Sequence, residues 1–252
     1  MRRVILFFLI FFALERACYM ATGGFTPYKI ELTNAEQPWQ SPLTEEIQTL
    51  LDQPFFYLGK GVQFYAFISQ DGKTVLKFMK QQKSRPSDWL ASFLGKRTKQ
   101  NKRRAKICES CKMAYEQLQD ETGVIFVQIK AHSSQVYPLR IYDKLGIAHT
   151  LDLNKTSFVL QKYATPLLES LTPDNLKALF DFIDRRSAKG ITNADPRIRN
   201  FGLLDDRIVE IDIGSFQTEP QIDEKAALTQ WLHDFSNTRL LQKGEASVAR
   251  RA

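Results

Sequence analysis

The chain has 252 residues, of which 43% are hydrophobic and 25% charged, and its formal net charge is +7 at pH 7. These proportions are ordinary for a globular protein that can bury one large core or two smaller ones. Three cysteines and no visible internal repeat exclude a disulfide framework and a repeat architecture. The basic balance favours acidic partners, namely phosphate-bearing ligands, anionic lipid or nucleic acid, without choosing among them.

The N-terminus has the character of a leader. Two arginines precede an unbroken apolar run, VILFFLIFFAL, over residues 4–14. This pattern is typical of a signal peptide, and the run is shorter than the about 20 residues of a membrane-spanning helix. Residues 1–20 are therefore expected to be a signal peptide or a short membrane anchor on a membrane-associated or exported protein. If Met20 is the true start, the protein is cytoplasmic.

Residues 21–54 are polar and rich in turns, and they are expected to form an N-terminal extension. Within it, SPLTEEIQTLL predicts a short helix from Ser41 to Leu51, with Ser41 as the N-cap and Pro42 at the first helical position. From Phe55 onward, aromatic and aliphatic residues alternate with polar ones. Asp71-Gly72 interrupts this alternation, which predicts two or three antiparallel strands.

After the first strands, the chain is expected to form one long helix, then further strands, and finally a mainly helical half. A long helix is expected from about Asn101 to Glu121, ended by Gly123. The break between a strand-rich half and a helical half falls near Ala164-Thr165-Pro166. This predicts an N-terminal lobe at 55–163, a reduced C-terminal lobe at 164–240 and a basic tail at 241–252. Further strands are expected at 124–130, 136–141, 148–153 and 157–162, and helices at 173–189 and 223–237.

A basic run, KRTKQNKRRAK, occupies residues 96–106 and follows the amphipathic stretch 86–94. The simpler interpretation is the solvated first turns of a helix. A second hypothesis is a docking site for an anionic membrane or a phosphorylated glycolipid. Nucleic acid is not expected as a partner, because no aromatic-interleaved platform or recognition motif accompanies the charge.

Two glycines, Gly59 and Gly61, stand two residues apart at an expected turn between strands. Glycine lets a backbone approach a ligand closely, although a plain hairpin turn accounts for the pair as well. Lys77 follows as a lone charge between apolar strand residues. It lies either on the solvent face or beneath the glycine turn, where it would meet the phosphates of a nucleotide.

The stretch NADPRIRNFGLLDDRIVEIDIGSF, residues 193–216, carries the most chemistry. Asp195 and Asn200 flank a short polar turn, and Asp212 ends the strand that follows. One of these groups can orient or deprotonate an acceptor hydroxyl while the others hold a metal. Mg²⁺ prefers such hard oxygen ligands. The alternative is an ordinary polar turn.

The order of these features resembles the protein kinase-like superfamily over residues 55–216. The shared order is a glycine turn, a strand lysine, a long helix with glutamates, a hinge strand, D-x-x-x-x-N and a strand ending in D-x-G. The motif is most similar to that of atypical small-molecule and lipopolysaccharide-core sugar kinases, whose catalytic loop tends to read G-D-P-x-x-x-N-F. The resemblance implies an α+β, bilobal fold with a strand-rich N-lobe, one long helix and a reduced helical C-lobe.

The resemblance also implies ATP and Mg²⁺ as cofactors, and a phosphotransfer to a hydroxyl of a sugar, glycolipid or protein. Asp195 would be the catalytic base, and Asn200 and Asp212 would hold the metal. Lys77 would contact the α- and β-phosphates and pair with Glu109, with Glu116 as the reserve partner. Further nucleotide contacts are implied for Gly59 and Gly61 in the lid and for Gln161, Lys162 and Tyr163 in the hinge.

Several positions depart from the family pattern. Ala194 replaces the usual His or Gly before the catalytic Asp, and Phe64 replaces the third loop glycine. Arg197 and Arg199 stand in the loop, where they either receive an anionic substrate or solvate the turn. None of these changes removes a phosphotransfer group, which favours an active kinase. A catalytically inactive pseudokinase that binds or scaffolds is the alternative, and an exported α+β protein with a coincidental match is a third.

Overall fold

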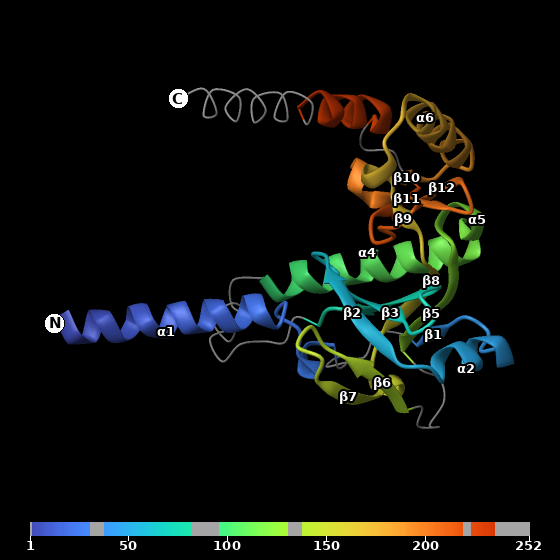
Figure 1. Cartoon of the computed structure of the whole chain (residues 1–252). Helices are drawn as coiled ribbons and strands as arrows, with labels where there is room; N and C mark the ends of the chain where they lie inside the picture. The colour runs from blue at the N-terminus through green and yellow to red at the C-terminus, as the bar shows by residue number, and fades with distance from the viewer. Residues whose placement is uncertain (1, 31–37, 82–95, 131–137, 219–222, 235–252) are drawn as a thin grey trace, which may run out of the picture. The chain divides into compact units, whose positions relative to one another are not determined.

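The computed structural model describes residues 2–30, 38–81, 96–130, 138–218 and 223–234 (Figure 1). The chain divides into two compact units. Unit 1 contains 1–108 and 124–163, and unit 2 contains 109–123 and 164–252. The division therefore falls inside helix α4 (Lys96–Glu116) and again after Tyr163, whereas the sequence placed all of 55–163 in one lobe. The stretch 86–94 and the basic tail lie outside the described residues.

Unit 1 begins with helix α1 (Arg2–Ala21), which continues well past the apolar run seen in the sequence. The window Val4–Ala21 has a mean hydropathy of 2.0 and is long and apolar enough to cross a membrane, and none of it is buried. A signal sequence passes the same test of length and composition. Gly23 and Gly24, both at positive φ, then turn the chain onto the sheet, where Tyr65 donates a hydrogen bond to the Gly24 carbonyl at 2.7 Å.

The main element of unit 1 is a curled eight-stranded sheet in the order β1-β5-β8-β4-β3-β2-β6-β7 (Figure 1). All neighbouring strands are antiparallel except β2 and β6. The Asp71-Gly72 turn joins β3 to β4, with Gly72 at φ 72, so the predicted hairpin is confirmed. The strands are β1 (Trp39–Gln40), β2 (Phe55–Lys60), β3 (Phe64–Ser69), β4 (Thr74–Met79), β5 (Val124–Lys130), β6 (Pro138–Tyr142), β7 (Ala148–Asp152) and β8 (Phe158–Lys162).

The two faces of this sheet carry different residues, because neighbours along a strand alternate between faces. Cross-strand register puts Tyr65 opposite both Lys60 and Phe78, and it puts Ala66 opposite Lys77. The face of Tyr65 and Phe78 covers the apolar core, which also includes Phe25, Ile47 and Phe158. Lys77 therefore lies on the other face.

Unit 2 is smaller and combines helices with short strands around its own apolar core, which includes Leu179, Phe182, Ile198, Phe201 and Leu228. Helix α6 begins at Pro173 after the Thr172 N-cap, whose side chain accepts a hydrogen bond from the Asn175 N–H. The other elements are α5 (Gln119–Thr122), β9 (Thr165–Pro166), η3 (Leu167–Ser170), α6 (Pro173–Ala188), β10 (Thr192–Asn193), η4 (Ile198–Asn200), β11 (Phe201–Leu204), β12 (Arg207–Glu210) and β13 (Phe216–Gln217), and residues 224–234 are helical.

The structure confirms the predicted α+β fold class, with a strand-rich unit, the long helix α4 and a smaller unit that combines helices with short strands. The limits of two predicted helices are wrong. The expected helix from Asn101 to Glu121 begins earlier and ends at Glu116, because Leu118 leaves the helical conformation to become fully buried. A short helix, α5, follows and ends at Gly123, which adopts the left-handed conformation.

The second correction concerns α2 (Glu45–Leu51), which is capped by Thr44 and not by Ser41. Thr44 Oγ1 accepts a hydrogen bond from the Ile47 N–H at 3.3 Å. Ser41 is buried instead against β5, where its hydroxyl accepts from the Val127 N–H at 3.0 Å. Ser41 thus contacts a residue that is distant in the sequence, and the spacing of residues around Ser41 does not predict this contact.

Replacing the cap tests this assignment. Thr44→Ala removes the acceptor for an otherwise unpaired helix N–H and is expected to lower the free energy of unfolding by about 1 kcal/mol. Thr49→Ala, one turn later on the exposed side of the same helix, is the matched control and should be neutral or slightly stabilising, because alanine has the higher helix propensity. Urea denaturation measures both. Equal effects would contradict the cap.

Candidate active site

The glycine turn lies between β2 and β3 of unit 1. Gly59 sits beside a register irregularity in β2, and the Gly61 N–H donates to the Phe64 carbonyl at 3.0 Å. A Cβ added at either glycine would meet nothing within 4 Å, and neither glycine has a positive φ. Neither packing nor backbone strain therefore requires glycine here, and the absence of side chains leaves the backbone open to close approach.

Lys77 lies in the middle of β4, on the face of the sheet opposite the apolar core. Its ammonium donates a hydrogen bond to Gln161 Oε1 at 2.5 Å. Gln161 lies in β8, directly opposite Val75 of β4, and so shares the face of Lys77. The amide of Gln161 thus holds the lysine head in position on this face.

The predicted hinge, Gln161 to Tyr163, is partly committed to the sheet. Gln161 pairs with β4 on one side and with β5 on the other. The Tyr163 N–H donates to the Lys73 carbonyl at 2.8 Å. A backbone contact to adenine would therefore come from the end of the strand, beyond Gln161, and the hinge role of these residues stays a prediction.

Glu109, the predicted partner of Lys77, lies on α4 in unit 2 and is exposed. Its ion pair is with Lys112, one turn on, at 3.9 Å. The reserve partner, Glu116, is also exposed. Since Lys77 belongs to unit 1, its pairing with either glutamate stays a prediction.

Asp195 lies in the turn between β10 and η4, and its backbone is fixed from two sides. Its N–H donates to Asn193 Oδ1 and its carbonyl accepts from Asn200 Nδ2, both at 2.7 Å. Its carboxylate contacts Arg197 Nε at 2.7 Å, and its side chain is 37% exposed. The predicted base is thus held on a rigid turn with its carboxylate at the surface of unit 2, and Arg197 is its partner.

The amide of Asn200 has a defined orientation. A carbonyl can only accept a hydrogen bond, so the nitrogen of Asn200 must face Asp195 and its Oδ1 must face away. Asn200 is buried, and its own carbonyl accepts from the N–H groups of Ile211, at 2.7 Å, and Asp212, at 3.4 Å. These bonds place Asp212 next to Asn200.

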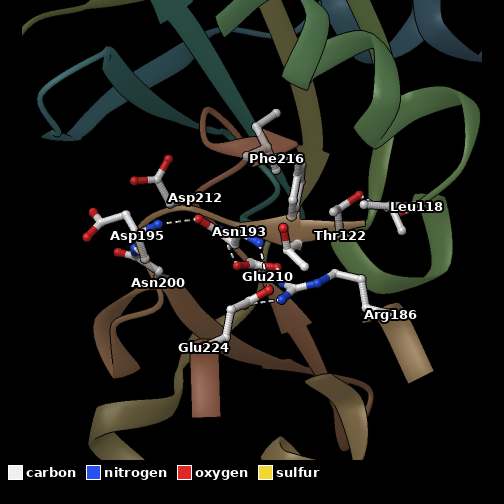
Figure 2. Close-up of polar contacts among 12 residues, drawn as sticks. Leu118, Thr122, Arg186, Asn193, Asp195, Asn200, Glu210, Asp212, Phe216 and Glu224 are labelled. Atoms are coloured by element: carbon white, nitrogen blue, oxygen red, sulfur yellow. Dashed lines mark hydrogen bonds and ion pairs between the residues drawn. The ribbon is translucent and has the colours of Figure 1, made fainter. Parts of the chain in front are cut away.

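Figure 2 shows Asp195, Asn200 and Asp212 together at one end of this region of unit 2, with both carboxylates away from Arg186. The Gly214 N–H donates weakly to Asp212 Oδ1, at 3.4 Å. The structure therefore brings together the three residues that the sequence singled out between 193 and 216. An amide oxygen and a carboxylate in this arrangement are hard donors of the kind that suit Mg²⁺.

A buried ionic network lies behind these residues (Figure 2). Arg186 of α6 forms ion pairs with Glu210 of β12 and Glu224, all of them buried. The other carboxylate oxygens bind Asn193, whose Nδ2 donates to Glu210 and whose backbone N–H donates to Glu224 at 2.7 Å. Because Asn193 Oδ1 in turn accepts from the Asp195 N–H, the network fixes the turn that carries Asp195.

The charges in this network alter one another's ionisation. Complete burial raises the pKa of Glu210 to about 7, against the opposing pull of Arg186 and with a smaller contribution from Glu224 in the same direction. Burial also disfavours the charge on Arg186, but Glu210 and Glu224 outweigh it and raise the arginine's pKa above its usual value. Arg186 therefore stays charged, and the network is built around it.

Sequence reasoning missed the network and one further contact, at Ser110. The Ser110 hydroxyl donates to the Ile213 carbonyl at 2.6 Å and accepts from the Phe216 N–H at 2.7 Å. It thereby holds the chain on both sides of Gly214, directly after Asp212. A serine beside Cys111 in a charged helix gives no local signal of this role, which depends on a contact about 100 residues away along the chain.

Two other features of the described residues bear on the site. No group of three or more His, Cys, Asp or Glu side chains that could hold a metal occurs among them. The arrangement of Asn200 and Asp212 supplies one carboxylate and one amide, so any cation there would depend on phosphate oxygens and water for its other ligands. A pocket of about 200 Å³ lies in unit 1 beside α2, lined by Leu51, Phe126 and Phe158 among others, and it contains none of the predicted site residues.

No protein-family model and no curated protein matches the sequence. Among solved structures, the chain is similar to the bifunctional kinase-methyltransferase WbdD, with 14% identity and a TM-score of 0.38 over 64% of this chain and 31% of that one. It is also similar to the LegK7 effector kinase of Legionella pneumophila, with 13% identity and a TM-score of 0.28 over 62% of this chain and 31% of that one. The chain thus spans less than a third of the length of either protein.

The buried network makes a prediction about stability. Arg186→Met leaves two buried carboxylates without their cation and is expected to lower the free energy of unfolding by roughly 3–5 kcal/mol. Arg185→Met is the matched control, because Arg185 is the exposed neighbour on the same helix and its loss should cost less than about 0.5 kcal/mol. Urea denaturation followed by circular dichroism measures both, and a similar loss in the two variants would contradict the network's role.

Proposed function

We propose that the protein is a kinase-like phosphotransferase that moves the γ-phosphoryl group of Mg-ATP to a hydroxyl group. The observation that carries this proposal is the turn around Asp195. The Asn200 amide is locked against the Asp195 carbonyl with its oxygen turned away, next to Asp212. This geometry supports one group for the acceptor hydroxyl and two oxygen donors for a cation on the same turn.

The residues would divide the work as follows. Asp195 would accept the proton of the acceptor hydroxyl while the new O–P bond forms and the bond between the γ-phosphorus and the bridging oxygen breaks, releasing ADP. Asn200 Oδ1 and Asp212 would hold Mg²⁺, which when bound offsets phosphate charge. Lys77 would bind the α- and β-phosphates, and the Gly59–Gly61 backbone would cover them.

For the acceptor we propose a sugar or glycolipid hydroxyl, as the likeness of the D-P-x-x-x-N-F loop to the atypical sugar kinases suggests. Arg199 is exposed and lies in η4, directly before Asn200, so it would contact an anionic group on the acceptor. The basic run at 96–106 would be a second contact for an anionic membrane or a phosphorylated glycolipid. Both roles rest on charge complementarity.

One observation favours the alternative, a pseudokinase that binds without catalysis. Arg197 Nε lies 2.7 Å from Asp195 Oδ1, where an acceptor hydroxyl would have to approach. In an active enzyme this arginine must move away or share the carboxylate. In a pseudokinase the ion pair would be permanent. Turnover separates the two.

Nucleotide binding is the first test. Mg-ATP is expected to raise the melting temperature of the full chain, and Lys77→Met should abolish that rise because the phosphates lose their cation. Lys73→Met, an exposed lysine in the preceding turn, is the matched control and should keep it. Asp212→Asn should weaken the rise only when Mg²⁺ is present. A rise of normal size in Lys77→Met would count against the phosphate site.

Turnover is the second test. Asp195→Asn is expected to lower the rate of ATP consumption by about two orders of magnitude or more, as for loss of a general base, while the melting-temperature rise with Mg-ATP persists. Arg197→Met should retain turnover if the arginine only shares the carboxylate. The rate is measured by ADP release with sugar and glycolipid acceptors. Undiminished turnover in Asp195→Asn would refute its role as the base, and nucleotide binding without turnover in the wild-type chain would establish the pseudokinase.

A further inference from the structure

A cluster of cations surrounds the last turn of α1 in unit 1. Three cations lie close to the centroid of the Tyr19 ring: Lys60 Nζ at 3.8 Å, Arg16 Cζ at 5.7 Å and Lys29 Nζ at 5.9 Å. Lys29 also donates to the Gly24 carbonyl at 2.6 Å. Tyr19 is fixed in turn, because Gly24 packs so closely against its ring that a Cβ there would lie 2.4 Å from it.

Lys80 extends the cluster along the sheet. Its ammonium lies 4.3 Å from the centroid of the Tyr65 ring and donates to the Gly61 carbonyl. Burial lowers the pKa of Lys80 to about 8, with repulsion from Lys60 and Lys29 in the same direction. Within the described part of the chain no carboxylate forms an ion pair with Arg16, Lys29, Lys60 or Lys80. These like charges therefore repel one another.

The cluster adjoins the glycine turn, because Lys60 lies between Gly59 and Gly61 and Lys80 donates to the Gly61 carbonyl, but the side chain of Lys60 lies on the face of the sheet opposite Lys77. Lys60 pairs with Tyr65 across β2 and β3, and Tyr65 pairs with Phe78, so these residues share one face of the sheet. Lys77 pairs with Ala66 and lies on the other face. Lys60 therefore faces away from the lysine that we propose for the phosphates of ATP, as does the ammonium of Lys80, which lies over the Tyr65 ring.

An exposed apolar turn adjoins the same end of α1. The turn between β6 and β7 exposes Leu145 by 55% and Ile147 by 53%. Asp143 holds the turn rigid, because its carboxylate accepts from the N–H groups of both residues, at 2.9 and 3.0 Å. Lys144 in this turn donates to the Met20 carbonyl at 2.9 Å, which fixes the turn beside the end of α1.

We propose that this surface, which we call the basic rim (Arg16, Lys29, Lys60, Lys80 and Lys144), binds the anionic headgroups of lipids in the membrane leaflet at which α1 ends. The Leu145–Ile147 turn would enter the interface beside it. The apolar helix α1 would place the rim at the membrane surface, where its positive charges would bind the negatively charged headgroups. Polybasic surfaces next to a membrane helix bind such leaflets, and exposed apolar side chains rimmed by cations are typical of interfacial contacts.

The test uses the full chain with a fluorescent reporter in the turn. Cys18 is the exposed cysteine, whereas Cys108 and Cys111 are buried. Cys18→Ser combined with Leu145→Cys therefore directs an environment-sensitive dye to the turn. The dye's emission is followed on titration with vesicles of phosphatidylcholine alone and of phosphatidylcholine with phosphatidylglycerol.

The emission is expected to rise and shift to the blue with the anionic vesicles, much less with the neutral ones, and the response should weaken at high salt. Lys29→Gln, Lys60→Gln and Lys80→Gln together should weaken the anionic response roughly 100-fold in lipid concentration. The matched control carries the same charge change at the exposed lysines Lys73, Lys155 and Lys177 and should respond like the parent. Melting temperatures check that both triple variants fold.

Three outcomes would overturn the proposal. The first is an equal response to neutral and anionic vesicles, which would assign the contact to α1 and the apolar turn alone. The second is an equal loss in the two triple variants, which would assign it to net charge. The third is the same emission change with ATP or inorganic phosphate in the absence of lipid, which would assign the rim to a soluble phosphate ligand.

Discussion

The turn that carries Asp195 depends on a buried cation. Arg186 is fully buried in unit 2 and pairs with Glu210 and Glu224, and the remaining oxygens of these carboxylates bind Asn193. The four residues come from α6, β12, the helix at 224–234 and β10. A charge removed from water is tolerated only when it is paired and hydrogen-bonded, so these segments must keep one arrangement. The position of Asp195 follows from that arrangement, because its backbone N–H donates a hydrogen bond to Asn193 Oδ1.

The buried network that fixes the turn is distinct from the partly exposed carboxylate that the turn carries. The buried network keeps its charges away from water, whereas the Asp195 carboxylate stands at the surface of the unit with Arg197 as its partner. Asn200 connects the Asp195 turn to the chain after β12, because its amide nitrogen donates to the Asp195 carbonyl and its own carbonyl accepts from the N–H groups of Ile211 and Asp212. Ser110 secures the chain after that strand. The predicted site residues are thus held in a fixed arrangement, with the Asp195 carboxylate partly exposed.

Local sequence patterns predicted the parts of this structure that local interactions determine. Alternation and Asp71-Gly72 identified the β3–β4 hairpin, and Asn200 and Asp212 lie together because they flank one short hairpin, β11–β12. Contacts between distant segments were not visible. Ser41 and Thr44 are equally good N-caps by composition, and the choice depends on a partner 86 residues away. Arg186 and Glu224 each look like ordinary charged helix residues, and their burial arises only from tertiary packing.

The proposed function also depends on residues that are distant in the sequence. Its central claim is that Lys77 and the Asn200–Asp212 pair bind one nucleotide. A crystal structure of the full chain with Mg²⁺ and a non-hydrolysable ATP analogue tests this most directly. We expect the α- and β-phosphates at the Lys77 ammonium and the metal bound by Asn200 Oδ1 and Asp212. A nucleotide bound away from Lys77, or a metal that contacts neither Asn200 nor Asp212, would contradict it.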